Sequence, residues 1–530
     1  MTTPPANRTP RQQQLLQQAE LHASRKEWDQ ARESFRALAA ERPGDAGVLL
    51  QLSYVESLSG HYRAARDYTL AADRLHPREQ EALHELLARL RTFNAIPELH
   101  ACIERLKPLH RVPIKVLLGA AAQCSYLNEQ DRALVLLDEA RRADPNFPPT
   151  LIARSQVLMY LGRFDEAEAE VTRGLQLGPD IPHGWSVLSK LRKQTPASNH
   201  VARLRQQLQR PGRPPALTAM LEEALHKELD DLGDHAQAWQ ALERMCRAKR
   251  STLDYSAAST RQLMDALASL PTDVESRADA GADAGPTPIF IVGMHRSGTT
   301  LLEQLLDGHS DVRGVGELYD FTCQMRFATD HHCRGVIDAT IVERARGVDF
   351  APVGAGYLDG MAWRLGKERF FTDKLPSNFL NIGFICRALP QAKILHMVRD
   401  PIETCFSNLR ELFSDANPYT YDQLELADFH AQYRRLMAHW HQAYPGRILD
   451  VDYAALTRDT ESVLRDVSAF CGFAFEPEML ALQNRTRGVA TASTVQVRNE
   501  VVVRDQPKWK PYEAWLQPLI RALRDYDNPG

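Results

Sequence analysis

The sequence predicts an α-helical repeat region followed by an α/β domain with a mostly parallel sheet, within one chain of 530 residues. Three observations support this fold class. A period of 34 residues runs through the N-terminal part, a glycine-framed strand, turn and helix lies at residues 288–302, and short apolar strands then alternate with helices. Such alternation implies crossover helices and parallel strands covered on both faces.

Composition favours a globular protein and argues against nucleic acid or a membrane as its partner. Hydrophobic residues make up 44%, charged residues 25%, and the net charge is -4, which gives no support for nucleic-acid binding. No stretch approaches the roughly 20 apolar residues of a membrane span, and the polar N-terminus lacks the apolar core of a signal peptide. The scattered cysteines contain no C-x-x-C pair, which indicates reduced thiols and argues against a zinc site. We therefore expect a cytoplasmic protein without a membrane partner.

The 34-residue period extends over residues 13–183, after a tail of residues 1–12 that we expect to be disordered. Five repeats fit, the third being degenerate. A turn register with residues that tolerate a left-handed backbone reads Lys26, Gly60, Asn94, Asn128 and Gly162. A large-residue register reads Trp28, Tyr62, Ile96, Gln130 and Phe164, and a mostly small-residue register reads Ala31, Ala65, Leu99, Ala133 and Ala167. Each repeat is therefore expected to be a helix pair whose register residues are core.

Residues 184–270 remain helical in pattern but lose the strict period. Gly233 marks one further repeat-like turn, shifted three residues out of phase, and the prolines at 211–215 are expected to break the solenoid. Residues 271–287 have the composition of a linker. The second domain is therefore expected to cover residues 288–530.

In this domain, charged residues follow several of the expected strands. The strands are expected at residues 289–292, 312–315, 369–372, 393–398 and 447–451. Ligands of parallel sheets lie beyond the carboxyl ends of the strands. Lys374 and Arg399 follow two strands, and Arg296 lies in the loop after the first. The sequence therefore predicts an anion-binding edge in a chain that is acidic overall.

The loop between the first strand and its helix is framed by Gly293 and Gly298. A turn of this kind directs backbone N–H groups and the positive end of a helix dipole at one point, which suits a phosphate. The spacing of the glycines is that of a nucleotide-triphosphate loop, but Thr299 stands where that motif has lysine. We therefore expect a P-loop-like phosphate site that is not an ordinary ATP or GTP site.

These features resemble the sulfotransferase superfamily, whose donor is 3′-phosphoadenosine 5′-phosphosulfate. With the repeats in front, the chain is more closely similar to bacterial fusions of tetratricopeptide repeats with a sulfotransferase domain, and distantly to protein-tyrosine sulfotransferases. The resemblance rests on residues 293–300, 316–317, 372–376, 398–401, 491–498, Ser407 and Tyr453. His295 departs from the family pattern, which usually has proline at this position.

The resemblance implies a role for each matching residue. Glu317 would be the general base toward an acceptor hydroxyl, and Arg296 and Lys374 would stabilise charge on the transferring group, with Asp373 orienting Lys374. The residues implied in donor binding are Arg296, Ser297, Gly298, Thr299, Thr300, Arg399, Ser407, Tyr453, Ser493, Gln496, Arg498 and Lys508. Cationic side chains would replace magnesium, so no metal is expected.

Other interpretations stay open for several of these residues. Arg296 could be a surface cation, Arg399 could form a structural salt bridge with Asp400 or Glu403, and Glu317 could be a surface carboxylate. A histidine could be the base instead of Glu317, the candidates being His295, His309, His331, His332 and His396. Of these, His396 lies inside an expected strand and is more typical of a core residue.

The hypothesis from the sequence is sulfuryl transfer from the donor to an acceptor hydroxyl, for which a protein tyrosine is one candidate. The repeats would recruit a peptide, protein or glycan acceptor, or form a homo-oligomer. One alternative is a nucleotide-triphosphate-dependent, kinase-like enzyme that uses the same loop. The other is a repeat scaffold whose catalytic domain is inactive.

Overall fold

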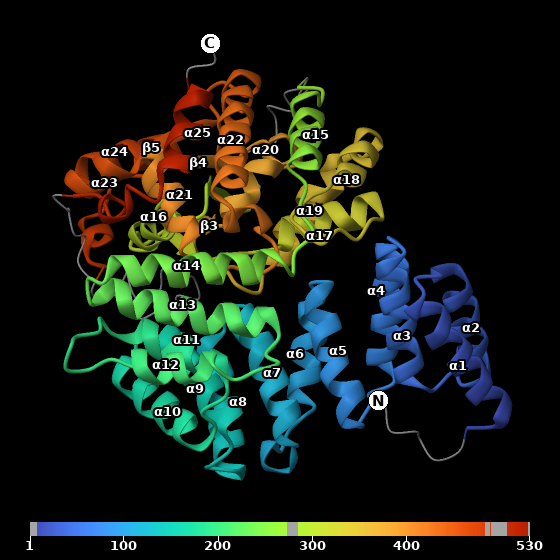
Figure 1. The fold of residues 1–530 in the computed structure, drawn as a ribbon. Helices are drawn as coiled ribbons and strands as arrows, with labels where there is room; N and C mark the ends of the chain where they lie inside the picture. Colours follow the sequence, from blue (N-terminus) through green and yellow to red (C-terminus); the bar gives the residue numbers. More distant parts are fainter. Residues whose placement is uncertain (1–7, 273–284, 483–487, 489–505, 528–530) are drawn as a thin grey trace. The chain divides into compact units, whose positions relative to one another are not determined.

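The computed structural model describes residues 8–272, 285–482, 488 and 506–527 (Figure 1). The chain divides into two compact units. Unit 1 comprises Met1–Pro145 and Tyr319–Val348, and unit 2 comprises Asn146–Leu318 and Asp349–Gly530. No helix in the described part of the chain is long and apolar enough to cross a membrane.

Unit 1 consists of helices, most of which form antiparallel pairs. Its helices from the N-terminal segment are α1 (Pro10–Ser24), α2 (Trp28–Glu41), α3 (Ala46–Leu58), α4 (Tyr62–Arg74), α5 (Gln80–Thr92), α6 (Ile96–Glu104), η1 (Leu109–Arg111), α7 (Ile114–Tyr126) and α8 (Gln130–Ala143). The later segment adds α17 (Asp320–Thr329), α18 (Ala339–Arg344) and η2 (Ala345–Gly347). The α-helical repeat region predicted from the period is thus confirmed.

The registers of the 34-residue period coincide with the helix boundaries. The large-residue register supplies the first residue of the second helix in each pair, namely Trp28, Tyr62, Ile96, Gln130 and Phe164. The turn register adopts the left-handed conformation, with φ of 62° at Lys26, 84° at Gly60, 52° at Asn94, 62° at Asn128 and 78° at Gly162. The small-residue register is fully buried, whereas Trp28 and Phe164 are only half-buried. One short-range pattern therefore fixes both the turns and the helix contacts.

The first helix begins earlier than the sequence predicts. Thr9 caps α1, because its hydroxyl accepts the Gln12 N–H at 3.3 Å while the Gln12 side chain accepts the Thr9 N–H at 3.2 Å. Pro10 occupies the first helical turn, where its missing N–H costs nothing. The end of the predicted tail, residues 10–12, is therefore helical, and residues 1–7 lie outside the described residues.

Helices of the same kind open unit 2 (Figure 1). They are α9 (Pro148–Tyr160), α10 (Phe164–Leu177), α11 (Pro182–Leu191), α12 (Val201–Leu208), α13 (Pro215–Asp231), α14 (His235–Arg250) and α15 (Ala257–Ala268). Gly233, with φ of 77°, forms the expected turn between α13 and α14. The prolines at 211–215 do not break the stack, because α13 begins at Pro215 and packs against both α11 and α12. Most of the predicted linker, residues 273–284, lies outside the described residues.

The rest of unit 2 is built on a parallel sheet. Its strands are β1 (Thr287–Gly293), β2 (Val312–Gly314), β3 (Phe370–Asp373), β4 (Lys393–Val398) and β5 (Ile448–Asp452), in the order β2-β3-β1-β4-β5. All four strand pairings are parallel, which confirms the predicted α/β class. β2 and β3 lie on one side of β1, and β4 and β5 lie on the other. The strand order therefore reverses at β1, and ligands of such sheets bind at this reversal.

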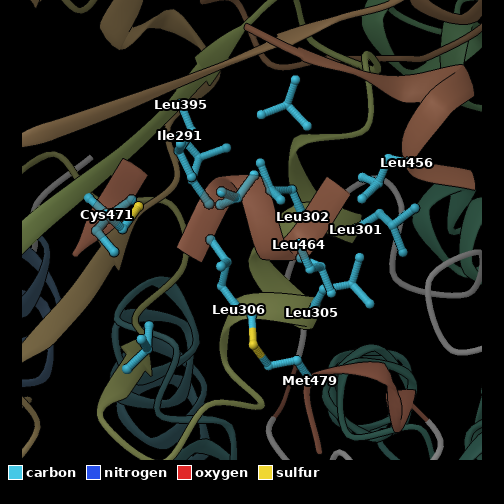
Figure 2. Close-up of a cluster of buried hydrophobic side chains, with 14 of the residues drawn as sticks. Ile291, Leu301, Leu302, Leu305, Leu306, Leu395, Leu456, Leu464, Cys471 and Met479 are labelled. Carbon is cyan, nitrogen blue, oxygen red and sulfur yellow. The ribbon is translucent and has the colours of Figure 1, made fainter. Parts of the chain in front are cut away.

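Helices cover both faces of this sheet. Figure 2 shows one face, where Ile291 and Leu395 pack against Leu302 and Leu306 of α16 (Thr299–Leu306) and against Leu464 of α24 (Thr460–Cys471). The remaining elements are α19 (Phe350–Met361), η3 (Pro376–Asn381), α20 (Ile382–Ala388), α21 (Pro401–Leu409), η4 (Pro418–Tyr421), α22 (Gln423–Ala443), α23 (Tyr453–Arg458), η5 (Pro477–Leu480), η7 (Lys510–Tyr512) and α25 (Gln517–Asp527). The apolar face of α16 thereby anchors the loop that precedes it.

Candidate functional site

The loop between β1 and α16 is a tight turn that only a few residue types can form. Arg296 has φ of 66° and Gly298 has φ of 112°. A Cβ atom at Gly298 would lie 2.4 Å from Cδ2 of Tyr453, and one at Gly293 would lie 2.9 Å from the Met397 carbonyl oxygen. Both glycines are therefore required by close contacts, and Gly298 is the N-cap of α16.

Hydroxyl groups line the inside of this loop. Ser297 is 1% exposed, and its Oγ has no hydrogen-bond partner among the residues that the structure describes. Thr299 and Thr300 follow as the first two residues of α16 and are also buried. A buried, unsatisfied hydroxyl costs free energy, so this one beside a helix N-terminus fits an anion that accepts its hydrogen bond.

Arg296 is buried in the same loop. Its side chain is 8% exposed, its Nε donates to Oγ of Ser407 at 3.3 Å, and its Nη1 lies 3.9 Å from Glu411. Burial lowers the pKa of Arg296; Glu411 opposes this effect, and the positive charges of Arg410 and Arg399 add to it. Arg296 is thus no surface cation, and the charge of its arginine neighbours makes a bound anion favourable.

Arg399 lies against this loop and is engaged by several groups. Its Nη1 donates to the Arg296 carbonyl at 3.0 Å, its Nη2 donates to Glu403 at 2.8 Å, and its guanidinium lies 4.4 Å from the ring centre of Tyr453. Glu403 also accepts the backbone N–H of Lys508 at 2.8 Å. The salt bridge to Glu403, which was the structural alternative for Arg399, is present, and it joins Arg399, Tyr453 and Lys508 in one cluster with the loop.

Glu317 and Lys374 form an ion pair beyond the ends of β2 and β3. The two strands stay paired past their last residues, since the N–H of Lys374 donates to the Gly316 carbonyl at 3.0 Å. Gly316 has φ of 84°. This turn places the Glu317 carboxylate 2.5 Å from Nζ of Lys374. Lys374 is fully buried whereas the Glu317 side chain is 36% exposed, so a solvent-facing carboxylate meets a buried cation.

Two further carboxylates hold these strand ends. Asp373 is fully buried and accepts the Tyr357 hydroxyl at 2.9 Å and Nδ2 of Asn378 at 3.3 Å. Glu303 of α16, which the sequence reasoning missed, is 1% exposed and accepts the Gly316 N–H at 2.7 Å. The signal for Glu303 is a carboxylate between the leucine pairs of a short helix that is buried along its whole length. It ties the turn before Glu317 to the helix after the phosphate-type loop.

The helices at the start of unit 2 also reach this site. Lys190 of α11 donates to Glu223 of α13 at 2.8 Å and lies 3.5 Å from Glu411. The two carboxylates raise the pKa of Lys190 against the effect of its burial. Glu411 thus lies between Arg296 and Lys190. No motif in the sequence indicated this contact, because its members come from three distant segments.

His295 is the loop residue whose surroundings link both halves of the site. Burial lowers its pKa to about 4; the charge of Glu317 opposes that shift, and those of Lys374 and Arg296 contribute to it. Its ring packs edge-on against Phe413, with centroids 5.4 Å apart. His295 is therefore neutral at pH 7, and the charges of Glu317, Lys374 and Arg296 all act on its pKa.

The other histidines that were candidate bases have structural partners. Nε2 of His309 donates to the Ala474 carbonyl at 2.8 Å, and Nδ1 of His309 accepts the Asp311 N–H at 3.0 Å. His331 pairs with Asp338 at 2.7 Å, and the His332 ring packs on Tyr62 and Phe93 in unit 1. His396 contacts Asp450 and Tyr433. Three predicted donor-binding residues, Ser493, Gln496 and Arg498, lie outside the described residues.

Comparison with known proteins agrees with this fold. Residues 288–477 match the model of the sulfotransferase family, and residues 129–191 match a tetratricopeptide-repeat model. The chain therefore combines a tetratricopeptide-repeat region with a sulfotransferase-family domain, and the resemblance drawn from the sequence is confirmed.

Individual relatives are more distant. An uncharacterized protein of Aquifex aeolicus is 27% identical over 414 residues, which are 75% of this chain but only 54% of that protein, so the match spans about half of its length. A Caenorhabditis briggsae protein named "Putative protein-tyrosine sulfotransferase" is 25% identical over 247 residues, covering 45% of this chain and 85% of that protein. The sulfotransferase domain of the Synechococcus PCC 7002 olefin synthase aligns with a TM-score of 0.33 and 20% identity, over 47% of this chain and 97% of that domain.

Proposed function

We propose that the protein is a sulfotransferase that moves a sulfuryl group from 3′-phosphoadenosine 5′-phosphosulfate to an acceptor hydroxyl. The observation that carries the proposal is the ion pair of Glu317 and the buried Lys374, 2.5 Å apart beyond the ends of β2 and β3, because β3 lies beside β1 and the loop after β1 holds Arg296. A carboxylate paired with one cation, with a second cation on the neighbouring loop, suits a reaction in which a hydroxyl loses its proton while negative charge develops on a leaving oxygen.

In this proposal the loop and its neighbours hold the donor. Backbone N–H groups at the start of α16 and the hydroxyls of Ser297, Thr299 and Thr300 bind the 5′-phosphosulfate. Arg399 and Ser407 bind the 3′-phosphate. Arg399 then either donates to the phosphate and to Glu403 together, or breaks its ion pair with Glu403. Ser407 is already in contact with Arg296 at 3.3 Å, which supports one continuous anion site.

Glu317 takes the proton of the acceptor hydroxyl in the proposed reaction. The acceptor oxygen forms a bond to sulfur as the bond between sulfur and the bridging oxygen of the donor breaks, leaving adenosine 3′,5′-bisphosphate. Lys374 and Arg296 supply positive charge where the sulfonate and the bridging oxygen become more negative. The partial exposure of Glu317 supports its role, because an acceptor must reach it from solvent.

A protein tyrosine is the acceptor that we propose first. Tetratricopeptide repeats are helical surfaces suited to binding peptides, and the matched Caenorhabditis protein carries a tyrosine sulfotransferase name. A glycan or a small hydroxylated molecule is the alternative. Incubation with ³⁵S-labelled donor and two peptides that differ only by tyrosine or phenylalanine distinguishes these cases. Label in the tyrosine peptide alone supports protein sulfation, and label only in carbohydrate or small molecules contradicts it.

Nucleotide titration tests the reaction class independently of the acceptor. We expect adenosine 3′,5′-bisphosphate to bind more tightly than ATP with magnesium, because Thr299 replaces the lysine of a triphosphate loop. A preference for ATP with magnesium would favour the kinase-like alternative. Binding of the bisphosphate without transfer to any acceptor in a cell lysate would favour the inactive scaffold.

A further inference from the structure

A cluster of His396, His441 and Asp450 in unit 2 takes no part in the proposed reaction. The carboxylate Oδ1 of Asp450 lies 2.7 Å from Nδ1 of His396 and 2.9 Å from Nε2 of His441. All three potential ligand atoms lie within 4.8 Å of one another. Two imidazole nitrogens and one carboxylate oxygen therefore lie near enough to one another to be ligands of one ion.

The backbone holds the three residues in this arrangement. His396 of β4 and Asp450 of β5 are direct cross-strand partners in the parallel sheet, so their side chains lie on the same face. His441 lies near the C-terminal end of α22, two helical turns after Tyr433, which contacts the His396 ring from the same helix. The positions of the ligands are thus set by a strand pairing and a helix rather than by loops, which favours a defined geometry.

Exposure differs among the three side chains in a way that suits a metal ion. The His396 side chain is 8% exposed, that of His441 36% and that of Asp450 53%. One ligand is therefore rigid and buried, while the other two leave a side open to solvent. An ion can enter there, and water can complete its coordination.

The second nitrogen of His396 has a partner of its own. Nε2 of His396 is hydrogen-bonded to the hydroxyl of the buried Tyr433, which leaves Nδ1 directed at Asp450. Metal-binding histidines regularly have such a hydrogen bond on the nitrogen that does not bind the metal, because it orients the ring. The Tyr433 hydroxyl also receives a backbone hydrogen bond from Met294, the residue that begins the loop before α16.

We propose that His396, His441 and Asp450 form a binding site for a divalent transition metal of the zinc class. Imidazole nitrogens with one carboxylate suit zinc, nickel or copper, whereas calcium and magnesium prefer oxygen ligands alone. Ligand bonds of about 2 Å in a tetrahedral site place ligand atoms roughly 3.3 Å apart. The separations of 2.7 and 2.9 Å are close to this value, so small side-chain movements suffice. The role of the site is structural, because a bound ion would join Asp450 of β5 to His396 of β4 and His441 of α22.

Zinc titration of the full-length, chelator-treated protein tests the proposal. In competition with a chromophoric chelator, we expect one tight equivalent of Zn²⁺ per chain and a higher melting temperature with zinc. His441→Ala and Asp450→Ala should each remove this equivalent, and Tyr433→Phe should weaken it about 10- to 100-fold by loss of the hydrogen bond to His396. The described cysteines are all buried, which limits competing thiol sites.

His439→Ala is the matched control, since His439 lies on the same helix but outside the cluster. This variant should keep the zinc equivalent. Melting temperatures measured without metal show whether each variant folds. Equal zinc binding by the unmodified protein and a folded His441→Ala variant would overturn the proposal, and so would the lack of any tight equivalent in the unmodified protein. The cluster would then be a hydrogen-bonded network in which Asp450 accepts from both histidines.

Discussion

Two buried arginines, one in the repeats and one in the loop before α16, differ in what surrounds their charge. Arg89 of α5 is 4% exposed; its Nη2 donates to the Ser53 carbonyl at 2.8 Å, and its guanidinium lies 4.3 Å from the ring centre of Tyr54. Arg296 has other cations nearby, since Arg399 and Arg410 act on its charge. Burial lowers the pKa of both residues, to about 10 for Arg89.

The difference separates a structural charge from a functional one. Hydroxyls and a carbonyl complete the hydrogen bonds of Arg89 inside the protein, aromatic rings cover its guanidinium, and the charge of Glu85 acts on it. The positive charges of Arg410 and Arg399 act on Arg296 in addition to the carboxylate of Glu411, so a bound anion adds a further favourable partner for this group of arginines. Burial of a charge alone therefore does not identify a site, whereas several like charges gathered at strand ends do.

The largest effect that would test this comparison is expected at Glu317. Replacement by glutamine removes the proton acceptor but keeps the size of the side chain near Lys374. We expect kcat to fall about 100- to 10,000-fold, with the affinity for adenosine 3′,5′-bisphosphate unchanged. Steady-state kinetics and calorimetric titration measure the two quantities. Turnover close to that of the unmodified protein would make His295 the better candidate for the base.

Arg296→Ala and Arg89→Ala form the direct test of the two arginines. The first change should lower kcat about 100- to 1,000-fold, the cost of losing one group that stabilises developing charge, and should also weaken bisphosphate binding. The second should lower the stability of the repeats by about 1–3 kcal/mol, because it leaves buried acceptors unpaired, without changing bisphosphate affinity. Similar affinity losses in both variants would show that the contrast between the two sites is wrong.

Two left-handed glycines extend the comparison to the backbone. Gly298→Ala places a Cβ 2.4 Å from the Tyr453 ring, so we expect bisphosphate affinity to fall by about tenfold or more through displacement of the loop. Gly233→Ala, at φ of 77° with no atom within 4 Å, should cost only about 1–2 kcal/mol of stability. Its bisphosphate affinity should not change. Isothermal titration and thermal melting of both variants provide the measurements.

The smallest expected effect concerns pH and His295. Burial lowers its folded-state pKa to about 4 from the ordinary 6.5, so between these values the unfolded chain binds a proton that the folded chain does not. This residue's contribution to stability is therefore present above about pH 6.5 and decreases as the pH falls toward 4. His295→Asn should lose less stability than the unmodified protein between pH 7.5 and 5. The melting temperature of each protein is measured across this pH range. An equal decrease in both proteins would contradict the buried, neutral state of His295.

Most of the repeat fold could be read from the sequence because its determinants are local. A residue such as Gly60 ends one helix and Tyr62 begins the next, and both are recognisable from their spacing alone. The loop before α16 was recognisable for the same reason, since its glycines and Thr299 are contiguous. The exception is the start of α1, where the cap formed by Thr9 and Gln12 extends the helix into residues whose composition predicts a disordered tail.

The two architectures, the turns between the repeat helices and the kinds of residue at the strand ends follow from the sequence alone, because they depend on short-range periodicity. Only the tertiary structure decided which of those residues meet. Glu317 contacts Lys374, and His396 lies beside Asp450, whereas the contact of Arg399 with Glu403 joins residues only four apart in the sequence. The first two contacts depend on the pairing of β2 with β3 and of β4 with β5. That pairing joins strands that lie far apart in the chain, so no local stretch of sequence encodes it.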